Sequence, residues 1–146
     1  NKVKENITEI AKIKNIEVVY SYTIQMYNSF NLVNILDFLR KWNADHTYLR
    51  DFDEHFAERV QQTYLSTALL DNKDRNSIMS DLGGYISKHP EMTRLGHEIM
   101  DVLQADAGRT VSEAERKYFS DYTAKLDKVR KTNLVDLDPR FKKYLI

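Results

Sequence analysis

The side chains with the best-defined chemistry near the start of the chain are two amides, Gln25 and Asn28, which follow Ser21 and Thr23. An amide donates and accepts hydrogen bonds at once, so it can bind a polar ligand through both kinds of contact. Both amides also have a structural interpretation, because Gln25 can be a solvated residue and Asn28 can form the turn ahead of the next element. These residues alone leave the two interpretations open.

The densest set of possible metal ligands has a spacing that matches no known metal site. Its members are histidines and acidic residues: His46, Asp51, Asp53, Glu54 and His55. No HExxH pattern is present, so we interpret the set as a solvated surface. A second acidic segment begins at Asp71, but it lacks the Gly and Glu that a calcium loop needs at its sixth and twelfth positions, and helix capping is the preferred interpretation.

The two amides belong to a segment with a two-residue period. Residues 16–26 (IEVVYSYTIQM) alternate an apolar face with a face that becomes more polar toward Gln25, which predicts a β-strand. Helical patterns lie on both sides, at residues 3–13 and 31–42, with Asn31 as the expected N-cap of the second. The order helix, strand, helix is typical of parallel sheets and barrels, in which chemistry occurs at the carboxyl ends of the strands.

From about residue 71 the chain is predicted to be helical, with helix starts after Asp71, near Pro90 and at Ser112. The last helix, residues 111–131, begins with a capping box at Ser112 and Glu115. Its apolar stripe is expected to dock on the rest of the chain and contains Val111, Tyr118, Phe119, Tyr122, Leu126 and Val129.

Residues 48–64 give the least certain pattern, because an aromatic or apolar residue recurs every four positions. This spacing favours a helix up to about Glu58. For residues 59–66 the pattern does not decide between strand and helix.

Composition limits the classes of function. Lys and Arg together number 22 and balance 22 acidic residues, so the chain lacks the basic excess of a nucleic-acid binder or of a protein that binds anionic membranes. No apolar run approaches the roughly 20 residues that span a bilayer. The absence of cysteine fits a reducing compartment, and we expect a soluble, cytoplasmic protein.

Three stretches carry a resemblance to a known family. Residues 20–39 (YSYTIQMYNSFNLVNILDFL) resemble the late barrel strand and following helix of radical S-adenosylmethionine enzymes, particularly those with a twitch or SPASM extension. Residues 126–141 (LDKVRKTNLVDLDPRF) resemble the chain end of that group. Residues 63–70 (TYLSTALL) resemble the segment that leaves the next barrel strand, and the resemblance places that strand near residues 59–65.

The resemblance implies a cofactor that this chain does not hold by itself. The family binds a 4Fe-4S cluster through three cysteines, and this chain has none. It therefore resembles the C-terminal part of a longer enzyme, where it lines and covers the barrel and has no independent catalysis. S-adenosylmethionine and the cluster are expected only in the full-length protein.

The resemblance also assigns roles to particular residues. Thr23, Gln25 and Asn28 are expected to contact the cofactor, while Asp127 and Arg130 match the Asp and Arg of the terminal motif and are expected to contact substrate. The alternative for the last two is a pair of charges on one helix face, three residues apart.

We therefore expect an α/β protein, with a partial (β/α) barrel segment at residues 1–70 and a helical extension at residues 71–146. The alternative fold is mainly α with a small sheet. A strand in so short a barrel segment needs partners, either the missing N-terminal barrel half or a second copy of the chain. The alternative function is a non-catalytic helical domain that binds another protein.

Overall fold

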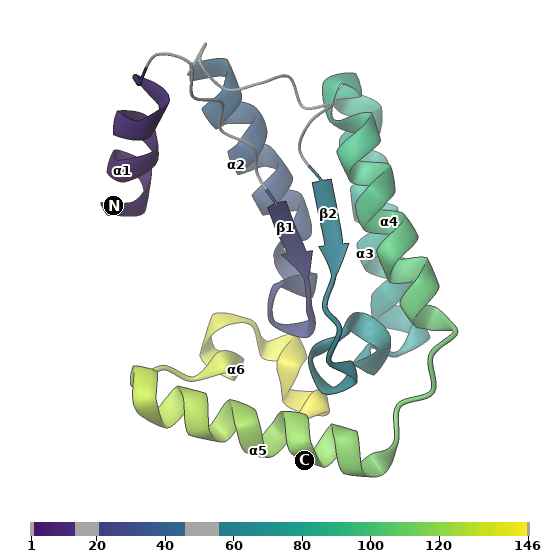
Figure 1. The fold of residues 1–146 in the computed structure, drawn as a ribbon. Helices are drawn as coiled ribbons and strands as arrows, with labels where there is room; N and C mark the ends of the chain where they lie inside the picture. The colour runs from purple at the N-terminus through teal and green to yellow at the C-terminus, as the bar shows by residue number, and fades with distance from the viewer. Residues whose placement is uncertain (1, 14–20, 46–55, 146) are drawn as a thin grey trace.

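The computed structural model describes residues 2–13, 21–45 and 56–145, in which short parallel strands lie among helices (Figure 1). The strands are β1 (Ser21–Ile24) and β2 (Phe56–Arg59). The α-helices are α1 (Lys2–Ala11), α2 (Leu32–Asp45), α3 (Asn72–Lys88), α4 (Thr93–Ala107), α5 (Glu113–Arg130) and α6 (Leu134–Leu137). Short 3-10 helices connect them: η1 (Met26–Asn31), η3 (Thr63–Leu65), η4 (Thr67–Leu69), η5 (Pro90–Met92) and η6 (Pro139–Tyr144).

The sheet consists of β1 and β2, which run parallel with Ser21 opposite Phe56 and Ile24 opposite Arg59. Helix α2 lies between them in the chain, as the predicted order of elements requires. The described part of the chain is thus mainly α with one small parallel sheet and contains no barrel, which agrees with the alternative fold. None of its helices has the length and apolar character needed to cross a membrane.

The predicted strand at residues 16–26 is confirmed only in part. Within β1 the burial alternates as expected, because Ser21 and Thr23 are exposed while Ile24 is buried. The strand ends at Ile24, so its extension to Met26 is wrong: Gln25 precedes η1 and Met26 begins it. Residues 14–20 lie outside the described ranges.

Helix α2 starts one residue after Asn31, but Asn31 is the last residue of η1. The helical run therefore begins earlier than the sequence predicted, with Gln25 ahead of its first turn.

The helix expected up to Glu58 is wrong at its end, where β2 occupies Phe56–Arg59. Because four is an even number, residues that recur every four positions also lie on one face of a strand. The spacing of Phe56 and Val60 is therefore compatible with the two-residue period of a strand. Pairing with β1 decides between the two. The undecided residues 59–66 contain the end of β2 and the short helix η3, and residues 46–55 lie outside the described part.

The predicted helices of the second half are confirmed, including their starts. Asp71 caps α3 by accepting the N–H of Asp74 at 2.8 Å. Pro90 is in the first turn of η5, and the capping box of α5 pairs Ser112 with Glu115. A single cluster of buried side chains draws residues from both sides of the predicted boundary at residue 70, and the division into two parts stays a prediction.

Helix α5 buries a narrower face than the predicted stripe. Phe119 is fully buried, but Tyr118 is 53% exposed and Val129 is 80% exposed. The buried residues on α5 are Phe119, Ser120 and Thr123. The expectation that the whole stripe docks is therefore wrong. The helix crosses beyond the carboxyl ends of both strands (Figure 1). It packs against the rest of the chain through one narrow face, which carries its buried residues.

The C-terminal tail docks on the start of α3. The Tyr144 hydroxyl donates to Asp74 Oδ2 at 2.8 Å and accepts the N–H of Asp71 at 3.2 Å. Lys143 Nζ lies 2.8 Å from Asp74 Oδ2. These contacts join residues 143 and 144 to the first turn of a helix about 70 residues earlier in the chain.

We expect the tail to loosen in alkaline solution. Burial raises the pKa of Tyr144 to about 12, whereas an unfolded tyrosine has a pKa near 10. The stabilising contribution of the protonated hydroxyl is thus complete below about pH 10 and is lost as the pH rises through about 12. Urea unfolding at several pH values should show this loss for the wild type and a smaller loss for Tyr144→Phe. At pH 7, Tyr144→Phe should cost about 1–2 kcal/mol.

The control for this prediction is Tyr118→Phe, because Tyr118 is exposed. Equal pH dependence of the Tyr144→Phe variant and the wild type would contradict the assignment.

Candidate functional site

The three predicted cofactor residues lie together at the carboxyl end of β1. Thr23 is exposed on the strand, Gln25 follows the strand, and Asn28 lies in η1. Glu58 of β2 is opposite Thr23 and is also exposed, so the two strands present polar side chains on one face. The sequence order therefore becomes a spatial cluster at one end of the sheet.

The side chain of Asn28 is engaged by the backbone of the strand end. Its Nδ2 donates to the carbonyl of Thr23 at 2.9 Å, and its Oδ1 accepts the N–H of Gln25 at 3.0 Å. Burial raises the pKa of Tyr22, whose hydroxyl is buried beside Asn28 without a partner of hydrogen-bond geometry. Asn28 thus has a clear structural role, while its part in cofactor binding stays a prediction.

We expect Asn28→Ala to cost about 1–3 kcal/mol in free energy of unfolding, because it removes two hydrogen bonds from the partly buried end of the strand. Asn34→Ala is the matched control. Asn34 is exposed on α2, and its loss should change the free energy by less than about 0.5 kcal/mol. Urea unfolding followed by circular dichroism measures both. Equal effects of the two substitutions would show that the Asn28 contacts contribute nothing to stability.

Tyr27 connects this end of the sheet to α5. Its hydroxyl lies 2.8 Å from Thr123 Oγ1, which itself donates to the carbonyl of Phe119 at 2.8 Å. Since the Thr123 hydroxyl has a single proton, Tyr27 is the donor of the first bond. The Tyr27 ring also packs against Phe119 with a centroid distance of 5.3 Å. These contacts hold η1 against the helix that carries the other predicted site residues.

Asp127 and Arg130 lie at the far end of α5. Asp127 Oδ2 accepts the N–H of Leu134 at 3.0 Å, so the carboxylate secures the turn between α5 and α6. Among the ion pairs of the described residues, none joins Asp127 to Arg130. Burial raises the pKa of Tyr27, with smaller opposing effects of Asp127, which raises it, and Arg130, which lowers it. Asp127 and Arg130 follow Thr123 by four and seven residues in α5, so they lie on the face of the helix that meets Tyr27.

A buried carboxylate stabilises the connection that follows β2. Asp106 of α4 is fully buried and accepts the Thr67 hydroxyl at 2.8 Å and Arg109 Nη1 at 3.1 Å. Arg75 is also buried, and it donates to the carbonyls of Thr67 at 3.1 Å and Leu70 at 3.0 Å. Burial lowers the pKa of Arg75, and the charge of Asp106 opposes that effect.

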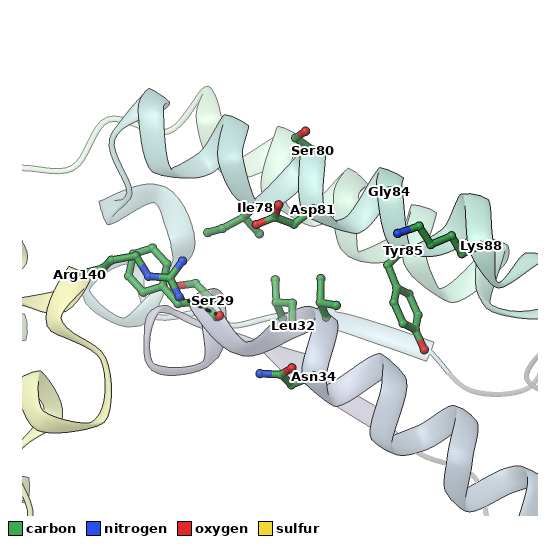
Figure 2. Close-up of a pocket in the computed structure, with 12 residues that line it drawn as sticks. Ser29, Leu32, Asn34, Ile78, Ser80, Asp81, Gly84, Tyr85, Lys88 and Arg140 are labelled. Atoms are coloured by element: carbon green, nitrogen blue, oxygen red, sulfur yellow. Dashed lines mark hydrogen bonds between the residues drawn. The ribbon is translucent and has the colours of Figure 1, made fainter.

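A groove lies away from the candidate site. It has a volume of about 490 Å³ and runs between α2 and α3, with Arg140 at one end and Tyr85 and Lys88 at the other (Figure 2). Arg140 already pairs with Asp138 at 2.6 Å and stacks on Phe30. None of the five predicted site residues lines this groove.

No cluster of three or more possible metal ligands occurs within residues 2–13, 21–45 and 56–145. The histidines and acids of residues 46–55 lie outside these ranges. In the calcium-like segment, Asp71 caps α3, as the preferred interpretation predicted. Its carboxylate also accepts a hydrogen bond from Lys143 Nζ.

Sequence reasoning missed Tyr27 and Thr123 as the contact between the two groups of candidates. Tyr27 stands between Gln25 and Asn28, and Thr123 follows Phe119 by four residues on one helix face. That spacing was visible, but the contact joins residues 96 positions apart.

Comparisons of the chain with protein-family models, curated proteins and solved structures give no match.

Proposed function

We propose that this chain is the C-terminal portion of a radical S-adenosylmethionine enzyme, in which it lines and covers one end of a (β/α) barrel. The observation that carries the proposal is the convergence of Thr23, Gln25 and Asn28 at the carboxyl end of a parallel strand pair. In parallel barrels this end holds the chemistry. Helix α5, which crosses beyond the same end, supplies Asp127 and Arg130.

Within this proposal the chain contributes contacts and no redox centre. A cluster held by cysteines elsewhere in the longer protein would supply the electron that cleaves S-adenosylmethionine to methionine and a 5′-deoxyadenosyl radical, which takes hydrogen from substrate. The Thr23 hydroxyl and the Gln25 amide suit the ribose and amino-acid groups of such a cofactor. Asn28 orients this end, and Arg130 is exposed for a substrate carboxylate. The reducing cytoplasm is the expected compartment.

The test compares the longer protein, including its cysteine-bearing part, with this chain alone. We expect iron and S-adenosylmethionine to bind the longer protein, and neither to bind this chain with micromolar affinity. Gln25→Ala in the longer protein should weaken cofactor binding about tenfold in calorimetry, equivalent to about 1.4 kcal/mol. Gln104→Ala is the matched control, because Gln104 is exposed on α4. Stoichiometric iron on this chain alone, or an unchanged Gln25→Ala variant, would refute the proposal.

A protein-binding domain is the second candidate, favoured by apolar side chains on the outside of α5 and α6. Val129 is 80% exposed and Leu137 is 74% exposed. Sedimentation of the wild type and of Val129→Ser tests this function. Association that the substitution weakens, in a protein without cofactor binding, would favour this candidate over the first.

A further inference from the structure

The two strands differ in what covers their outer edges, and the backbone determines which groups point outward. Val60 donates its N–H to the carbonyl of Ile24 at 3.3 Å, so the backbone polar groups of these two residues point toward the partner strand. Backbone polar groups alternate sides along a strand. The polar groups of Ala57 in β2 and of Ser21 and Thr23 in β1 therefore point to the outer edges.

The outer edge of β2 is closed by α4. Glu98 Oε2 accepts the outward N–H of Ala57 at 3.2 Å, and an ion pair with Arg94 holds the same carboxylate. Helix α4 runs alongside β2 in Figure 1. A further strand could pair here only by displacing Glu98 and the helix that carries it. Side chains that occupy edge groups in this way prevent strand addition.

Among residues 2–13, 21–45 and 56–145, hydrogen bonds cover the outer edge of β1 at one position, which the Asn28 amide occupies. A third, parallel strand would place opposite Ile24 a residue that donates to the Thr23 carbonyl and accepts the Gln25 N–H. The Asn28 amide makes these same two bonds, so it replaces the backbone N–H and C=O of the last residue of such a strand. The outward N–H of Thr23 has no partner among the described residues.

We infer that a parallel strand, encoded ahead of α1 in a longer polypeptide, pairs with the outer edge of β1 and ends at Thr23. The inference rests on the longer protein of the proposed function but needs none of its chemistry. Parallel strands are joined through a crossover that is usually a helix, as α2 joins β1 to β2. Helix α1 precedes β1 in the same manner, so the preceding strand belongs upstream of it. In the longer protein, further strands then lie beyond β1, and β2 is the edge strand of the sheet.

Amide hydrogen exchange of this chain and of the longer protein tests the inference without any substitution. We expect the Thr23 N–H to exchange at least about 100-fold more slowly in the longer protein, because its new bond must open first. The Ala57 and Val60 amides, already bonded to Glu98 and Ile24, are the internal controls and should keep their relative rates.

Three results would overturn the inference: an unchanged Thr23 rate, a selective slowing of Ala57, or Thr23 protection in a dimer of this chain alone, detected by sedimentation. Iron and cofactor assays on the same longer protein separate the two proposals. Thr23 protection without cofactor binding leaves the strand inference standing and refutes the reaction. Cofactor binding with an unprotected Thr23 refutes the strand inference and leaves the proposed reaction standing.

Discussion

Asp106→Ala is expected to destabilise the protein by about 3–5 kcal/mol, a large share of the 5–15 kcal/mol typical of a domain. Asp106 is fully buried and pairs with Arg109, while its charge also acts on the buried Arg75. Its removal leaves Arg75 in the interior without that compensating charge. The Thr67 hydroxyl and Arg109 also lose their buried acceptor, and breaking such a buried pair costs far more than the loss of a surface pair.

The measurement is urea unfolding of Asp106→Ala, Asp106→Asn and Asp121→Ala. Asparagine keeps the volume and can still accept the Thr67 hydroxyl, so Asp106→Asn separates the loss of charge from the loss of packing. Asp121 pairs with Lys117 on the exposed surface of α5, and its removal should cost at most about 1 kcal/mol. Equal costs for Asp106→Ala and Asp121→Ala would contradict the role of the buried network.

Phe119→Ala should cost about 3–5 kcal/mol, because Phe119 is the fully buried aromatic residue of α5 and its ring packs on Tyr27. Val129→Ala, in the same helix but 80% exposed, should change the free energy of unfolding by less than about 0.5 kcal/mol. Thermal and urea unfolding of the two variants measure the difference. A small cost for Phe119→Ala would mean that α5 is not anchored on the rest of the chain through this residue.

The same pair of variants also tests whether α5 holds Asp127 and Arg130 beside Tyr27. Helix α5 carries Asp127 and Arg130, so loss of its anchor in Phe119→Ala should displace both charges from Tyr27. The Tyr27 phenol would then lose its partner Thr123. In Val129→Ala these contacts remain. Ultraviolet titration of tyrosine should therefore change in the first variant and stay unchanged in the second.

The candidate site was predictable where it depends on neighbours in the chain. Thr23, Gln25 and Asn28 fall within six residues, so one strand and the turn after it suffice to bring them together. Their joining to α5 was not predictable, since Tyr27 and Thr123 meet across 96 residues. The exposure of Val129 and the burial of Phe119 likewise depend on how much of α5 finds a surface to cover.

By itself the sequence determined the features that arise within one or two turns of chain: the helix caps at Asp71 and Ser112, the start at Pro90, and the alternation through β1. Only the tertiary structure decided that Phe56–Arg59 is a strand, since a four-residue repeat fits both periods and Glu98, 41 residues away, satisfies its outward N–H. Local patterns reflect the geometry of neighbouring residues, whereas the partners of a strand edge or a helix face come from distant segments.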